Sequence, residues 1–151
     1  MCGIIGYVGS RECKPVLLHG LKRLEYRGYD SSGIALLEKS GLEYKRAVGV
    51  LQNLERVADG HESAATTGLG HTRWATHGGV TEQNAHPLAA EDGHIAVVLN
   101  GIVENYRELR TELVGRGHVF TSETDAETVT HLVEEAYDGD LLEAVRTVYA
   151  Q

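Results

Sequence analysis

Hydrophobic residues along the chain follow two spacings, one typical of short buried strands and one typical of amphipathic helices. The first spacing predicts five strands, at residues 3–8, 34–37, 68–76, 95–99 and 119–120. The second spacing predicts five helices, at residues 17–24, 50–58, 103–113, 124–136 and 141–150. Strands therefore lie on both sides of helices along the chain, which predicts an α/β or α+β fold.

Polar residues and glycines set the expected ends of these elements. Asp140 and Glu143 form a capping-box pattern at the start of the last helix. Gly115 and Gly117 are suited to end the helix that begins near residue 103. Residues 26–33 are polar and bounded by glycines, so we expect a loop there before the second strand.

Composition is that of a water-soluble globular domain. The chain has 151 residues, of which 42% are hydrophobic and 24% charged, which fits one domain or part of one. It carries 22 acidic and 14 basic side chains, a formal net charge of −8, so nucleic acid is not an expected partner. Residues 101–151 hold 11 acidic and 4 basic side chains, which predicts helices with acidic solvent faces.

Neither a membrane span nor a secretion signal is expected. Even the longest purely apolar runs are short, such as residues 95–99, whereas a membrane helix needs about 20 apolar residues. The first residues lack a basic leader, and the two cysteines, Cys2 and Cys13, are too few for a disulfide framework. We therefore expect a cytoplasmic protein.

We also expect no metal and no cofactor. His71, His77 and His86 lie close in sequence, but their spacing matches no zinc pattern and the two cysteines are distant from them. The glycine-rich stretches contain neither of the common phosphate-binding patterns.

Cys2 is the strongest candidate for a reactive group. Removal of Met1 would place its thiol beside its own α-amine, whose pKa near 7.7 to 8.0 lets it accept the thiol proton near neutrality. Retention of Met1 would turn that amine into an amide without a basic lone pair, so the unprocessed chain should be inactive. The alternative is that Cys2 is only a small residue that begins a strand.

Four further residues could complete an acyl-transfer site. The Asn100 side-chain amide and the Gly101 backbone N–H could hold a developing oxyanion, although Asn-Gly is also a common hairpin turn. Arg73 could bind a substrate carboxylate through two hydrogen bonds, or could be a surface ion-pair partner. Asp125 could bind a substrate ammonium group, or could cap the helix that follows it.

Six blocks of sequence follow one another along the chain. They are residues 1–9 (MCGIIGYVG), 24–33 (LEYRGYDSSG), 71–78 (HTRWATHG), 84–87 (NAHP), 100–105 (NGIVEN) and 122–125 (SETD). Taken in this order, the blocks resemble the class II glutamine amidotransferases. The resemblance covers residues 1 to about 137 and points to the amino-sugar branch of that family.

The resemblance implies a role for each matching position. Cys2 would attack the side-chain amide of glutamine, its α-amine would be the general base, and Arg27 would orient the terminus. Asn100 and Gly101 would form the oxyanion hole. The glutamine carboxylate would be held by Arg73 and its amine by Asp125, with further contacts from Thr76 and His77. Residues 73–80 would form a mobile lid, in which Trp74 would gate the exit of ammonia.

The family also implies the fold and the partners. We expect an α+β, N-terminal-nucleophile αββα sandwich, with residues 1–151 forming a glutaminase domain that is cut short on its C-terminal side. Glutamine would be the substrate, and glutamate and ammonia the products. An isomerase portion, absent here, would use the ammonia to convert fructose 6-phosphate to glucosamine 6-phosphate, and a full-length relative would be a homo-oligomer.

Two other interpretations stay open. The same glutaminase chemistry could serve a different acceptor, as in relatives that make phosphoribosylamine, asparagine or glutamate. Alternatively, an unprocessed or truncated chain could be a folded scaffold without turnover.

Overall fold

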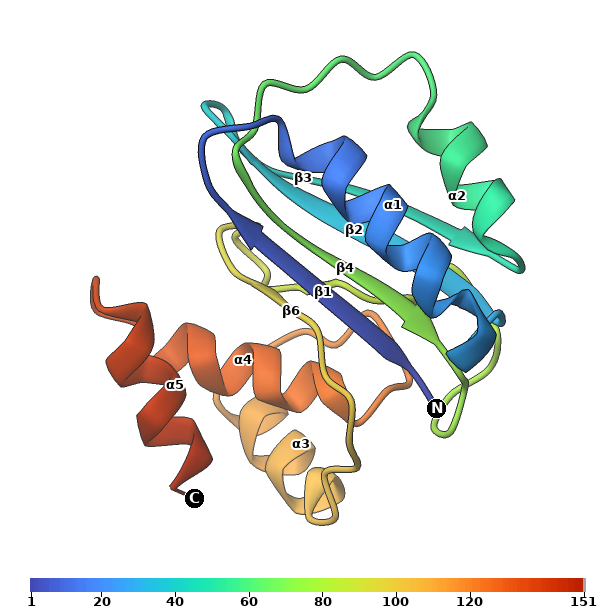
Figure 1. Ribbon diagram of the computed structural model, residues 1–151. Coiled ribbons are helices and arrows are strands. Elements are labelled where there is room, and N and C mark those ends of the chain that lie inside the picture. Colours follow the sequence, from blue (N-terminus) through green and yellow to red (C-terminus); the bar gives the residue numbers. More distant parts are fainter. Residues whose placement is uncertain (151) are drawn as a thin grey trace.

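A four-stranded antiparallel sheet forms the centre of the molecule in the computed structural model, which describes residues 1–150 (Figure 1). Gln151, the last residue of the predicted domain range, lies outside the described residues. The elements in chain order are β1 (Gly3–Val8), α1 (Cys13–Leu24), the 3-10 helix η1 (Glu25–Arg27), β2 (Ser31–Glu38), β3 (Gly41–Val48), α2 (Leu51–Ala58), β4 (Thr67–Arg73), β5 (Leu88–Ala89), β6 (Ala96–Val97), α3 (Tyr106–Gly115), α4 (Ala126–Ala136) and α5 (Leu141–Tyr149).

Strand order in this sheet is β1-β4-β2-β3, so two segments far apart in sequence become neighbours. Gly3 of β1 is opposite Thr72 of β4, and Ser31 of β2 is opposite Arg73. The first residues of β1 and β2 therefore lie beside the last residues of β4. This register brings Cys2 next to the segment that follows Arg73.

Helices α1 and α2 cover one face of the sheet (Figure 1). Leu17, Leu21 and Leu54 are completely buried in this layer, and burial of each leucine contributes about 1.5–3 kcal/mol. Ile5 packs against the same core, whereas Ile4, its neighbour in β1, is 40% exposed. The strand predicted at residues 3–8 is therefore present, but it is less buried than expected, because β1 is an edge strand whose side chains alternate between the core and solvent.

The other face of the sheet meets a second, two-stranded sheet, β5 with β6. The Arg46 guanidinium donates a hydrogen bond to the Ala85 carbonyl, 3.4 Å away, and thereby links the two layers. Helix α4 packs on the outer side of β5 and β6, with α3 and α5 beside it (Figure 1). A second core, which includes Ile95 and Val133, fills the space between them. The layers follow the order αββα, so the predicted α+β sandwich is confirmed.

Several local predictions differ from the structure. Strand β3 was not predicted, because its half-polar pattern at Gly41–Val48 lacks a buried apolar run. Ser31 begins β2 instead of lying in a loop, and the strand expected at residues 95–99 is reduced to two residues. Residues 119–120 form no strand, since the Val119 N–H donates to a Glu91 carboxylate oxygen at 2.7 Å.

The helix ends follow the predicted capping residues. The Asp140 carboxylate accepts a hydrogen bond from the Glu143 N–H at 3.1 Å, and α5 begins at the next residue after Asp140. Gly117 has a φ of +107° just after α3, a conformation that glycine adopts without strain. Within residues 1–150, no helix combines the length and apolar character that a bilayer span requires.

Candidate active site

A cavity of about 490 Å³ opens where the start of β1 and the end of β4 face the second sheet and the N-terminus of α4. The walls come from six separate stretches of the chain, which only the folded structure brings together. All nine residues that the sequence singled out line this cavity: Cys2, Arg27, Arg73, Trp74, Thr76, His77, Asn100, Gly101 and Asp125.

Cys2 presents its sulfur to the segment that follows β4. The Trp74 N–H donates a hydrogen bond to the Cys2 Sγ at 3.2 Å, and the Sγ lies 3.5 Å from the Trp74 carbonyl oxygen. The side chain is partly exposed to the cavity. Cys13, by contrast, is the first residue of α1 and is fully buried, and burial raises the pKa of its thiol. Of the two free cysteines, Cys2 is therefore the one that a substrate can reach.

Asn100 is held by a buried histidine. Its Oδ1 lies 2.9 Å from the Nε2 of His71, so the ring donates and the Asn100 amide N–H₂ is free to face the cavity. His71 stacks on His86 with ring centroids 4.4 Å apart, and the His86 Nδ1 accepts a hydrogen bond from the Leu99 N–H at 3.3 Å. The same two rings therefore position both Asn100 and the backbone that leads to it.

Burial keeps both histidines neutral. Desolvation lowers the pKa of His71 to about 4, with the Arg73 charge adding to the effect. Desolvation, together with His71 and Arg73, lowers the pKa of His86 to about 3. A neutral His71 whose Nε2 carries the proton is the form that fixes the Asn100 side chain. Asn100 does not form the alternative hairpin turn, because a helix follows it instead of a second paired strand.

Arg73 is buried, with 4% of its surface exposed, yet it has no salt bridge in the described part of the chain. Its guanidinium donates to the carbonyl oxygens of His77, Gly78 and Gly79, the last at 3.0 Å. Burial lowers the pKa of Arg73, but guanidinium groups keep their charge in proteins. The surface ion-pair alternative is wrong, and a buried cation without a counterion faces the cavity.

Asp125 directly precedes α4, but its side chain accepts no hydrogen bond from the first turn of the helix, so the helix-cap alternative is also wrong. Its Oδ2 accepts a hydrogen bond from the Val103 N–H at 2.8 Å, and its Oδ1 lies 3.9 Å from the His77 Nδ1. Asp125 is 5% exposed. The cavity therefore holds a buried cation and a buried carboxylate, which suits a ligand that carries both charges.

The segment at residues 73–80 is fixed at both ends. At its start, the Ala75 N–H donates to the Asp30 carboxylate at 2.9 Å. At its far end, the Asn84 side-chain amide donates to the Gly79 carbonyl at 3.0 Å, and the Glu123 carboxylate accepts from the Gly79 N–H at 3.0 Å. The predicted mobility of this lid stays a prediction; the contacts define where it is anchored.

Arg27, Met1 and Trp74 lie at the mouth of the cavity. The Arg27 guanidinium donates to the Met1 Sδ at 3.8 Å, so it already contacts the start of the chain. Trp74 is 45% exposed and packs edge-on against Tyr29, with ring centroids 5.7 Å apart. The gating role of Trp74 stays a prediction.

Sequence reasoning gave no role to several residues that shape the site: Asp30, His71, Asn84, His86 and Glu123. Each belongs to a quoted motif block, and each is polar but directed at the backbone or at another side chain. His71 and His86 were considered only as metal ligands, which their spacing argued against. The signal available in the sequence was the presence of these polar residues beside the proposed reactive residues.

Solved structures of two enzymes share this architecture. The glutamine phosphoribosylpyrophosphate amidotransferase from B. subtilis, complexed with ADP and GMP, superposes with a TM-score of 0.83 over 99% of this chain and 32% of its own, at 22% identity. A structure described as the allosteric regulatory enzyme of purine biosynthesis has the same TM-score over 99% of this chain and 33% of its own, at 24% identity. The fold is therefore that of the N-terminal-nucleophile amidotransferases.

Sequence comparison narrows the class further. A family model described as the glutamine amidotransferase domain matches residues 55–151. The chain is 56% identical over 146 residues to a glutamine–fructose-6-phosphate aminotransferase [isomerizing] of Thermus thermophilus, covering 97% of this chain and 24% of the relative. It is 54% identical over 151 residues to the enzyme of the same name from Streptomyces coelicolor, covering 98% and 25%.

The chain belongs to the glutamine amidotransferase domain family. It spans about a quarter of the length of the curated relatives that it matches. Membership in the family, and the resemblance to the aminotransferases of the amino-sugar branch, are thus confirmed.

Proposed function

We propose that this chain hydrolyses the side-chain amide of glutamine through a γ-glutamyl thioester on Cys2. The observation that carries the proposal is the shared cavity, in which an accessible thiol lies with a free amide donor, an unpaired guanidinium and a buried carboxylate. These groups match the four parts of bound glutamine that react or carry charge.

Removal of Met1 is the first requirement. It frees the Cys2 α-amine, which takes the thiol proton, and the thiolate attacks the amide carbon of glutamine. The amine then returns the proton to the departing nitrogen, so ammonia leaves and the thioester forms. Water adds to the thioester carbonyl with help from the same amine, and glutamate and the free thiol are regenerated. Arg27, which contacts Met1, is suited to orient the new terminus.

Negative charge develops on the carbonyl oxygen of the substrate in both steps, first in the amide and then in the thioester. The Asn100 side-chain amide and the Gly101 N–H are the proposed donors to this oxyanion, an arrangement whose loss typically costs about 10²–10³ in kcat. His71 is a positioning residue in this scheme, because its hydrogen bond leaves the Asn100 amide no orientation other than N–H₂ toward the cavity.

The two ends of the α-amino acid are held apart. Arg73 would bind the carboxylate in exchange for part of its contact with the loop carbonyls, and Asp125 would bind the ammonium group. Thr76 and His77 add contacts from the lid. This charge pattern favours glutamine over amides that lack an α-amino acid group.

The released ammonia has a proposed acceptor. Because the relatives are named for transfer to fructose 6-phosphate, we propose that this chain supplies ammonia for glucosamine 6-phosphate formation at an isomerase site outside residues 1–151. Homo-oligomeric assembly of the full-length enzyme and a cytoplasmic location stay predictions.

The test is glutamate release from glutamine by the chain with Met1 removed. Cys2→Ala should abolish release, and the matched Cys13→Ala variant should keep it, because Cys13 is buried in the core and does not line the cavity. An electrophilic glutamine analogue should label Cys2 and spare Cys13 by peptide mass spectrometry. Equal turnover in the wild type and the Cys2→Ala variant would refute the proposal.

A second measurement separates the scaffold interpretation from the catalytic one. The chain that retains Met1 should fold but release no glutamate, since the Cys2 nitrogen is then an amide.

Arg73→Ala in the processed chain should raise the glutamine KM more than it lowers kcat. An unchanged KM would remove Arg73 from carboxylate binding while leaving the thioester chemistry intact.

A further inference from the structure

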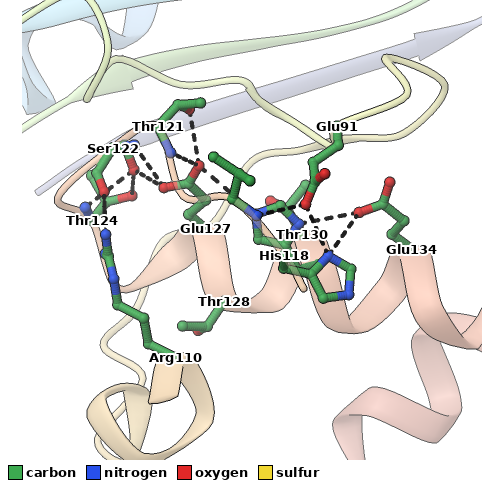
Figure 2. A network of polar contacts seen from close by, with 12 residues as sticks. Glu91, Arg110, His118, Thr121, Ser122, Thr124, Glu127, Thr128, Thr130 and Glu134 are labelled. Carbon is green, nitrogen blue, oxygen red and sulfur yellow. Dashed lines mark hydrogen bonds and ion pairs between the residues drawn. The ribbon is translucent and has the colours of Figure 1, made fainter. Parts of the chain in front are cut away.

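A second cluster of chemically active side chains lies away from the cavity, between α4, the segment after α3 and the turn from β5 to β6. Glu91, His118, His131 and Glu134 each direct one nitrogen or oxygen into a common space, and these four atoms all lie within 4.8 Å of one another. Figure 2 shows Glu91, His118 and Glu134 pointing toward one another beside α4. No residue of this cluster lines the proposed active site.

The spacing of these atoms is close to that of a tetrahedral metal site. Four ligands at zinc–nitrogen and zinc–oxygen distances of about 2.0–2.1 Å lie roughly 3.3 Å apart. The His118 Nδ1 lies 3.2 Å from the Glu91 Oε1 and 3.6 Å from the Glu134 Oε2, and the His131 Nδ1 lies 3.1 Å from the Glu134 Oε2. Contraction of the remaining pairs, which are at most 4.8 Å apart, by no more than about 1.5 Å would complete the tetrahedron.

The second nitrogen of each histidine faces another carboxylate. The His118 Nε2 lies 3.1 Å from the Glu135 Oε1, and the His131 Nε2 lies 3.9 Å from the Glu127 Oε1. Histidines that bind a metal through one nitrogen usually donate the other N–H to such a carboxylate, which fixes the ring and strengthens the ligand. His118 therefore has an outer carboxylate partner of the kind found at metal sites, and the Glu127 carboxylate lies near the second nitrogen of His131 without a hydrogen bond to it.

The charge of the cluster is unbalanced. Glu135 is paired with Arg116 at 2.8 Å, but no arginine or lysine pairs with Glu91, Glu127 or Glu134 in residues 1–150. The Glu127 carboxylate accepts hydrogen bonds from the backbone N–H and hydroxyl groups of Thr121 and Ser122, at 2.7–2.9 Å. Figure 2 shows the Thr121 and Ser122 contacts. A divalent cation at the centre would neutralise the two ligating carboxylates.

We propose that Glu91, His118, His131 and Glu134 bind one divalent cation of the zinc type. Two imidazole nitrogens with two carboxylate oxygens suit Zn²⁺, whereas Mg²⁺ and Ca²⁺ prefer sites made of oxygen atoms alone. The bound cation joins α4 to the two connections that flank it. Because α4 begins beside Asp125, the cation stabilises the layer that carries one wall of the cavity.

The spacing of residues along the chain does not indicate this site. The histidines that lie close in sequence, His71, His77 and His86, belong to the cavity, and the four ligands come from three separate segments. Glu91 follows β5, His118 follows Gly117 at the end of α3, and the other two lie one turn apart on α4.

The test is zinc binding to metal-free Cys2→Ala chain, a background in which the reactive thiol cannot hold the metal. Calorimetry should find one Zn²⁺ per chain, and Co²⁺ should give the visible bands of a tetrahedral complex. Added Zn²⁺ should also raise the melting temperature.

Variants define the site. Glu91→Gln and His118→Gln, both at partly exposed positions, should each weaken Zn²⁺ binding at least tenfold. Glu135→Gln, which alters only an outer partner, should weaken it about 10–100-fold. His94→Gln, at an exposed histidine of the same turn, should leave the affinity unchanged. Absence of stoichiometric binding, or equal affinity in the wild type and the His118→Gln variant, would overturn the proposal.

Discussion

The stacked pair His71 and His86 should make this fold lose stability in mildly acidic solution. Both rings are buried and neutral, with pKa values lowered by desolvation to about 4 and about 3, whereas an unfolded histidine has a pKa of about 6.5. Below pH 6.5 the unfolded chain therefore binds protons that the folded chain excludes. The free energy of unfolding must fall as the pH falls through this range.

The size of the effect follows from these pKa values. Between about pH 7.5 and pH 5, each histidine should contribute a loss of roughly 2 kcal/mol. His131 acts in the opposite direction: burial would lower its pKa, but Glu127 and Glu134 raise it, so its contribution is present at low pH and is lost as the pH rises. Glu127, whose pKa is about 2, loses its contribution only below about pH 4.5.

Urea unfolding at both pH values, in the wild type and in two variants, isolates the histidine pair. His71→Gln keeps a donor near Asn100, and His86→Asn keeps an acceptor near the Leu99 N–H, but neither side chain titrates. Each variant should lose about 2 kcal/mol less than the wild type between pH 7.5 and pH 5. A loss in both variants as large as that of the wild type would show that these rings are not the groups that titrate.

Three substitutions test other parts of the structure. Gly28→Ala would put a Cβ 2.7 Å from the backbone carbonyl carbon of Arg73, so it should cost about 1–3 kcal/mol in urea unfolding and also slow glutamate release; an active, stable variant would contradict this contact. Leu54→Ala, in the core beneath α2, should lower the free energy of unfolding by about 2–5 kcal/mol, while Leu142→Ala, 60% exposed, should change it by less than about 0.5 kcal/mol. Asp140→Ala removes the side chain that caps α5, so it should lower the free energy of unfolding by about 1 kcal/mol in urea. Equal stability of this variant and the wild type would contradict the capping role.

The helices were predictable because each shows its burial pattern locally. Leu17 and Leu21 lie one turn apart on α1 and are both completely buried, as their spacing predicts. Strand β3 was not predictable in this way, since its side chains are mostly half-exposed and its pairing with β2 depends on the tertiary fold. The same reason explains residues 119–120, where a Glu91 carboxylate 28 residues away takes the place of a strand partner.

In the candidate site, too, some residues could be identified from the sequence and others only from the folded structure. Cys2 could be singled out because its chemistry depends on its position in the chain. The proposed roles of Arg73 and Asp125 could not be separated from ordinary alternatives by spacing alone. The burial of both residues, the absence of a salt bridge to Arg73 among the described residues and the absence of a side-chain cap from Asp125 are properties of the folded chain. His71 was missed because its hydrogen bond to Asn100 joins two different layers.

Cys2 and Arg73 come from the first sheet, and Asn100 and Asp125 come from the opposite half of the sandwich. A ligand that touches all four is therefore a crosslink between two halves that otherwise meet through few polar contacts. By mass action, such a ligand favours the closed sandwich by RT ln(1 + [L]/Kd). Heat resistance of this chain should thus increase with the concentration of the amino acid in the cavity, and any change that pulls the halves apart should weaken substrate affinity before it unfolds either one.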